Sequence, residues 1–475
     1  MSTRIETDSM GEMAVPADAL HGASTQRALL NFPVSGRTLP GPIIHAYGLI
    51  KWAAARVHHA LGLVPEDKAA LIEQAALEVS EGKLDAHFVT DIYQTGSGTS
   101  VNMNVNEVIA NRACMLAGQP IGAKDPVHPN DHVNMGQSSN DTFPTAIHLA
   151  VAREMSDRLL PALTQLQAAL TRKGVEFWDV LKIGRTHLMD ATPVRLGQEF
   201  NGYARQAEHG VDRVHKSLKA LAELPLGGTA VGTGLNCHPG FAARAIALLA
   251  ERTGIPFREA QDHFEAQAGK DALVEVSGQL KTIATSLFKI ANDIRWLGSG
   301  PQCAIGEITL PATQPGSSIM PGKVNPVMCE SLMQVCARVF GNDATVTWCA
   351  AGGGNFELNV MMPALAAAML ESIDLLTNAT TLFRERCVEG ITANRERCLS
   401  LIEHSFAMVT GLNTMIGYDK AAEIAKESAR TGVSVRALCL ERLDELGITA
   451  AELDAALDPA RMTAPDAGLV GAGGA

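Results

Sequence analysis

Small hydroxyl and amide side chains cluster at four places along the chain, each followed by a helix-like pattern. These clusters are Gly96–Ser100, Ser138–Asp141, Thr186–His187 and Gly316–Pro326. The start of a helix offers unpaired N–H groups and partial positive charge, and small hydroxyl side chains add donors without crowding. Several such starts brought together would hold the carboxylates of a small anionic ligand.

Capping signals predict a helix start at or after three of the clusters. Ser138 and Asp141 have the spacing of a capping box. Thr192-Pro193 follows the third cluster and predicts an N-cap with proline at the first helical position. Asn325 and Pro326 end the fourth cluster in the same way. Because serine, threonine and asparagine begin many helices, one cluster alone indicates no more than capping. Four clusters, with a histidine and a lysine among them, favour an anion site.

Other ligand-binding motifs do not fit this chain. Gly316–Lys323 has five residues between its glycines where a P-loop has four, and Val324 replaces the serine or threonine of that motif. Gly232–Gly234 lacks the third glycine and the preceding strand of a dinucleotide-binding turn. Two histidines four residues apart flank Pro129, which argues against a shared helical face and a zinc site. We therefore predict no cofactor and no metal.

Long amphipathic helices are the main elements that the sequence predicts. Apolar residues recur every three or four positions from Ile147 to Leu170 and again from Leu273 to Leu297. Gly174 is expected to end the first of these helices. A helix of about 28 residues is roughly 42 Å long, and helices of that length pack in bundles, often with partner chains. Aromatic residues make up only 4% of the chain and regular alternation is rare, so a mainly α fold is predicted.

The composition limits the class of protein. The 475 residues are 46% hydrophobic, enough for a large core in two or three domains. The net charge of −12 argues against a nucleic-acid partner. The longest apolar run, near Val360–Leu370, is too short to cross a bilayer. Met1–Met10 is polar and the nine cysteines form no Cys-x-x-Cys pair, so a cytoplasmic protein with reduced thiols is expected. The glycine-rich end, Gly471–Ala475, is expected to fray.

The fourth cluster resembles the signature of a known family. Gly316–Pro326 is similar to the run Gly-Ser-Ser-x-x-Met-Pro-x-Lys-x-Asn of the fumarase/aspartase superfamily. Gln94–Arg112, His128–Thr145 and Gly184–Glu199 resemble the class II, iron-independent fumarases, and the likeness extends over nearly the whole chain. His187 stands where aspartases usually carry glutamine, so the resemblance favours a fumarase.

The resemblance implies a fold and an assembly. The fold is mainly α, in three domains, with a central bundle of long helices that forms a helical core shared between chains. The N-terminal domain would span residues 1–137, the long-helix domain 138–392 and a small helical domain 393–475. The family implies a homotetramer in which each site is built from three chains.

The resemblance also implies a reaction, the reversible hydration of fumarate to malate in the tricarboxylic acid cycle. Water adds and leaves in the anti sense, through a carbanion whose charge spreads into a carboxylate as an aci form. Ser317 would be the base, His187 the acid/base for the water, and Glu330 the carboxylate that orients His187. Serine needs a positively poised environment to act as an alkoxide, whereas histidine titrates near neutrality unaided.

The remaining site residues would bind the two carboxylates or a second anion. The predicted substrate-binding residues are Ser97, Gly98, Thr99, Ser138, Ser139, Asn140, Thr186, Ser318, Lys323, Val324 and Asn325. The predicted second anion site consists of His128, Pro129, Asn130 and Asp131. At this second site the chain departs from many relatives, which place an arginine where it has Lys124–Pro126.

Three alternatives remain open at this stage. The chain could be another lyase of the superfamily, releasing ammonia from aspartate, and His187 argues against that. It could hydrate a methyl-substituted fumarate, which no residue named above excludes. It could be a non-catalytic structural relative, but the joint presence of Ser317, His187 and Lys323 argues against that function.

Overall fold

The structure is a computed structural model that describes residues 2–466, so the predicted frayed end, Gly471–Ala475, lies outside the described residues. The chain divides into two compact units. The first unit is made of Met1–Ala162, Gly210–Thr285 and Val335–Asn378, and the second of Leu163–His209, Ser286–Gln334 and Ala379–Ala475. The three-domain division stays a prediction.

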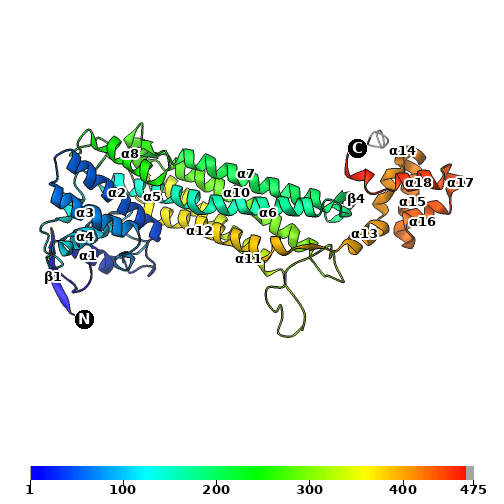
Figure 1. Ribbon diagram of the computed structural model, residues 1–475, viewed down its shortest axis with the longest axis horizontal. Helices are drawn as coiled ribbons and strands as arrows, with labels where there is room; N and C mark the ends of the chain where they lie inside the picture. The colour runs from blue at the N-terminus through cyan, green and yellow to red at the C-terminus, as the bar shows by residue number, and fades with distance from the viewer. Residues whose placement is uncertain (1, 467–475) are drawn as a thin grey trace. The chain divides into compact units, whose positions relative to one another are not determined.

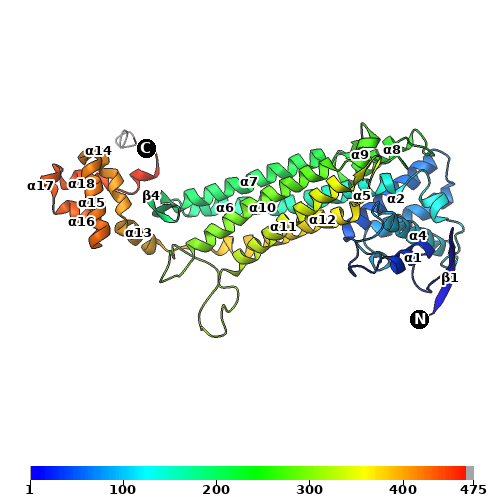
Figure 2. The same cartoon turned by 180° about the vertical axis from the view of Figure 1, so that it is seen from behind.

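Five long helices supply residues to both units. They are α6 (Leu160–Glu176), α7 (Leu196–Ala220), α10 (Asp271–Leu297), α11 (Val327–Gly353) and α12 (Met362–Arg386). Within each unit, the segments of these helices lie side by side (Figures 1 and 2). In the first unit, Asp343 of α11 accepts a hydrogen bond from Ser277 of α10 at 2.8 Å. The predicted mainly α fold is confirmed, and α10 has the predicted span.

The predicted end of the helix that follows Ser138 is wrong. The helix runs as α5 (Ser139–Glu154), a π-helical turn η3 (Met155–Leu159) and α6, which continues past Gly174 to Glu176. A Cβ at Gly174 would lie 2.0 Å from the side-chain oxygen of Asn201 in α7. Gly174 therefore allows two helices to approach closely and does not end either of them.

The first unit otherwise consists of shorter helices and very small sheets. Its helices are α1 (Ala23–Asn31), α2 (Gly41–Ala60), α3 (Glu66–Ser80), η1 (Asp85–His87), α4 (Thr99–Leu116), η2 (Pro129–Val133), α8 (Phe241–Thr253) and α9 (His263–Ala268). Its strands are β1 (Thr3–Asp8), β2 (Gly11–Pro16), β5 (Glu223–Leu224), β6 (Arg258–Glu259), β8 (Gly354–Asn355) and β9 (Leu358–Asn359). The core lies where α2 packs against α3 and α5.

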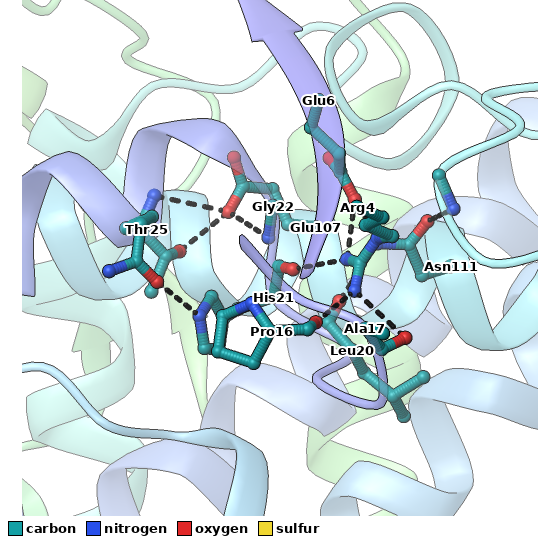
Figure 3. Close-up of polar contacts among 12 residues, drawn as sticks. Arg4, Glu6, Pro16, Ala17, Leu20, His21, Gly22, Thr25, Glu107 and Asn111 are labelled. Carbon is teal, nitrogen blue, oxygen red and sulfur yellow. Dashed lines mark hydrogen bonds and ion pairs between the residues drawn. The ribbon is translucent and has the colours of Figure 1, made fainter. Parts of the chain in front are cut away.

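A buried acid joins the start of α1 to α4 in this unit. Glu107 of α4 accepts hydrogen bonds from the Gly22 and Thr25 amides, at 2.8 and 3.2 Å, and from the Thr25 hydroxyl at 2.6 Å (Figure 3). α1 has no side-chain cap of its own, so this carboxylate serves as its cap. Next to it, Arg4 pairs with Glu6 of the same strand and donates to the carbonyl of Pro16 at 2.6 Å, which joins β1 to β2 (Figure 3).

The second unit contains a β-hairpin and a cluster of short helices. Its strands are β3 (Leu181–Thr186), β4 (Met189–Arg195), β7 (Ile308–Thr309) and β10 (Thr392–Ala393). Its short helices are η4 (Val388–Gly390), α13 (Arg395–His404), η5 (Phe406–Leu412), α14 (Asn413–Ile416), α15 (Tyr418–Thr431), α16 (Val435–Leu440), α17 (Leu443–Leu446), α18 (Ala450–Ala456) and η6 (Arg461–Thr463). Leu412, Leu438 and Leu453 belong to one buried core cluster in it. Among the described residues, none of the helices is long and apolar enough to cross a membrane.

Candidate active site

The start of α4 presents the hydroxyls of Ser97 and Thr99, and Ser97 lies between two glycines that no larger residue could replace. A Cβ at Gly96 would lie 1.6 Å from the carbonyl oxygen of Val360, and one at Gly98 would lie 2.2 Å from the Phe143 ring. Gly98 also has a φ of 75°, which glycine adopts without strain. The backbone is therefore packed tightly on both sides of Ser97, and the helix predicted to follow this cluster begins at Thr99.

A chain of hydroxyl groups connects the first two clusters. Ser97 Oγ lies 2.8 Å from Thr99 Oγ1, which lies 2.7 Å from Ser139 Oγ. Ser97 and Ser139 are buried, while Thr99 is half-buried. Because each hydroxyl can rotate its proton, this chain can turn its donors toward a carboxylate.

The start of α5 has the predicted capping box. Ser138 accepts from the Asn140 amide, and the Asp141 side chain accepts from the Ser138 amide at 2.9 Å. The Asn140 side chain donates to the carbonyl oxygen of Ala230 at 2.8 Å. The structure thus brings Ser97, Thr99, Ser138, Ser139 and Asn140 together in the first unit, where the N–H groups of two helix starts add positive potential.

The Ser317 loop lies in the second unit and is closed by its own backbone. The Gly316 amide donates to the Lys323 carbonyl at 2.9 Å, and the Asn325 side chain donates to the Gly316 carbonyl at 2.7 Å. Ser317 Oγ accepts from two backbone amides, those of Ile319 and Met320, at 3.1 and 3.0 Å. N–H donors at this oxygen would stabilise an alkoxide, which the predicted base requires.

Helix α11 begins one residue later than predicted. It starts at Val327, and the carbonyl of Pro326 accepts the first helical bond, from the Glu330 amide. Asn325 is not the N-cap, because its side chain is used to close the loop. Lys323, Val324, Asn325 and Glu330 line a cavity of about 660 Å³, together with apolar residues that include Trp296 and Leu310. Ser318 lies on the same loop and is exposed.

The predicted helix start after Thr186 and His187 is wrong. Thr192 and Pro193 belong to β4, and His187 and Leu188 form the two-residue turn between β3 and β4. Both turn residues have positive φ, 57° and 61°, as a type I′ hairpin requires. Side chains at such positions cost of order 1–3 kcal/mol each, and strain of this kind collects at functional sites. The turn leaves the His187 side chain exposed at the tip of a hairpin.

Buried ion pairs fix the β3 strand that leads to this turn. Arg185 donates to Glu307 at 2.9 Å, and the fully buried Lys182 contacts Glu307 at 3.3 Å and Glu199 at 2.8 Å. Burial raises the pKa of Glu199, and the positive charge of Lys182 opposes that rise. Removing one partner of a buried ion pair lowers the free energy of unfolding by about 3–5 kcal/mol, so these pairs hold the strand firmly in place.

The predicted second anion site lies in the first unit beside a pocket of about 330 Å³. His128, Pro129 and Asn130 line this pocket, and Asp131 pairs with the His128 ring at 3.2 Å. The pocket wall also contains Lys124 and the carboxylates of Glu6, Asp8 and Glu107. Its one lysine is therefore outnumbered by acidic side chains.

Known proteins match the chain along nearly its full length. Residues 11–341 match the family described as lyase, and residues 408–464 match the one described as fumarase C C-terminus. A class II fumarate hydratase from Neisseria meningitidis is 52% identical over 466 residues, which cover 98% of this chain and 100% of that protein. The chain belongs to the class II fumarate hydratase family.

Other members of the class II fumarate hydratase family agree with this placement. A mitochondrial fumarate hydratase from Saccharomyces cerevisiae is 50% identical over 98% of this chain and 94% of that protein. The crystal structure of a class II fumarase from Schistosoma mansoni has a TM-score of 0.93 at 41% identity and covers 97% of this chain and 99% of that one. This similarity confirms the predicted mainly α fold.

Sequence reasoning missed three features of the site in this fumarate hydratase family member. The Asp141 side chain was predicted only as part of a capping box, yet it also accepts N–H groups from Gly227 and Thr229. The burial of Lys51, whose Nζ donates to Asn134 and Gln137, was not predicted, although a single lysine within an apolar run was a signal for it. The ion pair of Arg185 had no signal at all, because its partner is over 100 positions away.

Proposed function

We propose that this chain catalyses the reversible addition of water to fumarate, giving malate, in the tricarboxylic acid cycle. The observation that carries the proposal is the Ser317 loop, which holds a serine with two N–H donors at its oxygen close to Lys323 and Asn325. Relatives at about half identity are named fumarate hydratases, which supports the same reaction.

In the dehydration direction, Ser317 removes a proton from the carbon next to one carboxylate of malate. The electron pair moves into that carboxylate and gives an aci form with one more negative charge than the substrate. In this proposal Lys323 and Asn325 stabilise this charge, and such donors speed the reaction because the charge develops only as the proton leaves. Val324 and Ser318 contribute their backbone and hydroxyl donors on the same loop.

His187 then protonates the departing hydroxide, and Glu330 orients its ring. Histidine suits this step because its proton exchanges near neutral pH. Thr186, beside it, binds substrate. The hydroxyl chain of Ser97, Thr99 and Ser139 binds the carboxylates in this proposal, helped by the starts of α4 and α5. Gly98, Ser138 and Asn140 complete this binding set.

The active form in this proposal is a homotetramer in which each site takes residues from three chains. The long helices α7, α10, α11 and α12 supply the bundle through which chains would pack. The exposed aromatic side chains Phe340 and Trp348 on α11 support an interface there. Closed symmetry then gives four equivalent sites.

We further propose that the reaction needs no metal or other cofactor and takes place in the cytoplasm. The residues assigned above supply the base, the acid and the charge stabilisation for each step. Among the described residues, no three histidine, cysteine or acidic side chains are grouped to hold a metal. Seven of the nine free cysteines are buried, which suits a reducing compartment. Activity that is lost with a chelator and restored by a metal would contradict metal independence. Cell fractionation tests the cytoplasmic location.

The pocket at His128, Pro129, Asn130 and Asp131 is proposed as a second anion site. Lys124 is the cation that lines it, in place of the arginine of many relatives. Because carboxylates share the wall, we expect binding of a dicarboxylate here to be weak and to fall with added salt.

One assay tests the function against its alternatives. Purified protein is supplied with fumarate, aspartate or methylfumarate, and loss of the conjugated double bond is followed by ultraviolet absorption while ammonia is measured separately. We expect turnover of fumarate and no ammonia from aspartate. Aspartate turnover at a similar rate would favour an ammonia-lyase. Faster turnover of methylfumarate than of fumarate would favour a methylfumarate hydratase, and no turnover of any of the three would favour a structural protein.

A further inference from the structure

A fully buried carboxylate joins the start of α5 to a distant loop. Asp141 accepts from the Ser138 amide at 2.9 Å through one oxygen, and from the Gly227 and Thr229 amides at 3.0 Å through the other. Burial raises the pKa of Asp141, but the three backbone N–H groups that donate to its two oxygens and the charge of Lys51 oppose this rise and favour the ionised carboxylate. A single side chain therefore fixes the backbone on two segments more than 80 positions apart.

A buried lysine provides the opposite charge. Lys51 of α2 is fully buried, and its Nζ donates to the side-chain oxygens of Asn134 and Gln137 at 3.0 Å each. Burial lowers the pKa of Lys51 to about 7, and the charge of Asp141 opposes that shift. Burial and the nearby charge of Lys51 lower the pKa of the neighbouring His58 to about 4, so its ring is neutral near pH 7. The charges of Lys51 and Asp141 act on each other inside the protein. Because the desolvation of buried charges can cost more than their attraction returns, the geometry that these residues impose explains them better than a gain in stability.

The loop that Asp141 holds is strained. Thr229 is β-branched and has a φ of 56°, a conformation that costs about 1–3 kcal/mol. A Cβ at Gly228 would lie 2.1 Å from the side-chain oxygen of Gln267, whose nitrogen donates to the Thr229 carbonyl at 2.9 Å. The Thr229 hydroxyl is buried and has no hydrogen-bond partner among the described atoms. A strained backbone conformation of this kind persists only where several contacts of the surrounding structure hold it in place.

The strained loop directly contacts a residue assigned to the substrate. The Asn140 side chain donates to the Ala230 carbonyl, next to Thr229, at 2.8 Å. The direction in which Asn140 points is thus set by the loop, and the loop is set by Asp141. We propose that Asp141 is a positioning residue, which orients Ser138, Ser139 and Asn140 toward a dicarboxylate by fixing residues 227–230, with Lys51 as its counter-charge. This inference rests on the proposed function of that site.

The test compares Asp141→Asn with a matched carboxylate of the same unit. Asparagine keeps the size but turns an amide donor toward backbone N–H groups, so the loop must shift. We expect the KM for fumarate to rise about 10- to 100-fold, with kcat changed less, because a lost hydrogen bond to a charged group weakens binding by a factor of this order. The Kd of succinate, a dicarboxylate that does not react, should rise in parallel by calorimetry. Asp343→Asn removes a buried carboxylate bonded to Ser277 and Lys281, and should lower the thermal midpoint without changing KM.

A second variant decides the matter if Asp141→Asn does not fold. Thr229→Gly relieves the positive φ, so it should fold normally, yet it frees the loop. We expect its KM to rise several-fold at an unchanged or higher thermal midpoint. An unchanged KM in Thr229→Gly, or a KM in Asp141→Asn no higher than in Asp343→Asn, would overturn the inference. A wild-type protein that neither hydrates fumarate nor binds succinate would instead refute the proposed function.

Discussion

The two groups of candidate residues are held in opposite ways. In the first unit, Ser97 and Ser139 are buried and hydrogen-bonded in a chain with Thr99. Asp141 fixes the adjacent backbone by accepting from the Ser138 amide. In the second unit, His187 and Lys323 are exposed, on a strained hairpin turn and on a loop closed by its own backbone. In the proposed function, the first group binds the carboxylates and needs a fixed direction. The second group contains the proposed acid/base His187 and the charge-stabilising Lys323, on surface segments that neighbouring chains would enclose in the proposed tetramer.

The largest effect should come from substituting Ser317, the proposed base on the second unit's loop. Ser317→Ala should lower turnover about 10²- to 10⁴-fold, the usual worth of a positioned base, while KM and the thermal midpoint change little. His187→Asn should behave in the same way. Steady-state kinetics with circular dichroism on each variant measure this. Turnover close to that of the wild type would remove the residue from its assigned step.

Substituting a proposed binding residue of the first unit should instead raise KM and change turnover less. Thr99→Val interrupts the hydroxyl chain between Ser97 and Ser139. A hydrogen bond to a charged group is worth about 1.5–3 kcal/mol, so kcat/KM should fall about 10- to 150-fold, mostly through KM. Thr285→Val, on an exposed part of α10, is the matched control and should change neither constant. A loss mainly in kcat would contradict the division into binding and reacting groups.

Much of this comparison could be predicted from sequence, and the failures have clear causes. The capping box at Ser138 and the glycine-bounded start of α4 were predicted because both are local patterns. The segment at His187 was assigned to a helix start, because Thr192-Pro193 imitates an N-cap, whereas pairing with β3 places it in a strand. The bonds of Asp141 to residues 227–229 could not be predicted, because they depend on contacts between distant segments.

Acid should destabilise the first unit through a buried histidine on α5. His148 contacts the carbonyls of Leu221 and Glu223, and burial lowers its pKa to about 4. Since the folded pKa lies below the unfolded value, the unfolded chain takes up the proton first, and stability is lost as pH falls from about 6.5 toward 4. At pH 5 the loss should be about 2 kcal/mol.

The measurement for this prediction is the thermal midpoint at pH 7.5 and pH 5. His148→Asn, which cannot gain a charge, should show a smaller fall between the two pH values than the wild type. His215→Asn removes an exposed histidine on α7 and should leave the fall unchanged. An equal fall in all three proteins would assign the acid sensitivity to other groups.

The last prediction tests why the reacting groups lie on exposed segments. If Ser317 and His187 of one site come from different chains, two inactive variants can restore each other in mixed tetramers. Each site then needs an intact serine from one chain and an intact histidine from another. Random mixing supplies each with a chance of one half, so about a quarter of the sites should be active. Ser317→Ala and His187→Asn are unfolded together, refolded, and assayed against each variant refolded alone. Two variants with the same substitution on differently tagged chains serve as the control for mixing. Mixed tetramers without recovered activity would place both residues of a site on one chain, and the exposure of the second unit's groups would then need another explanation.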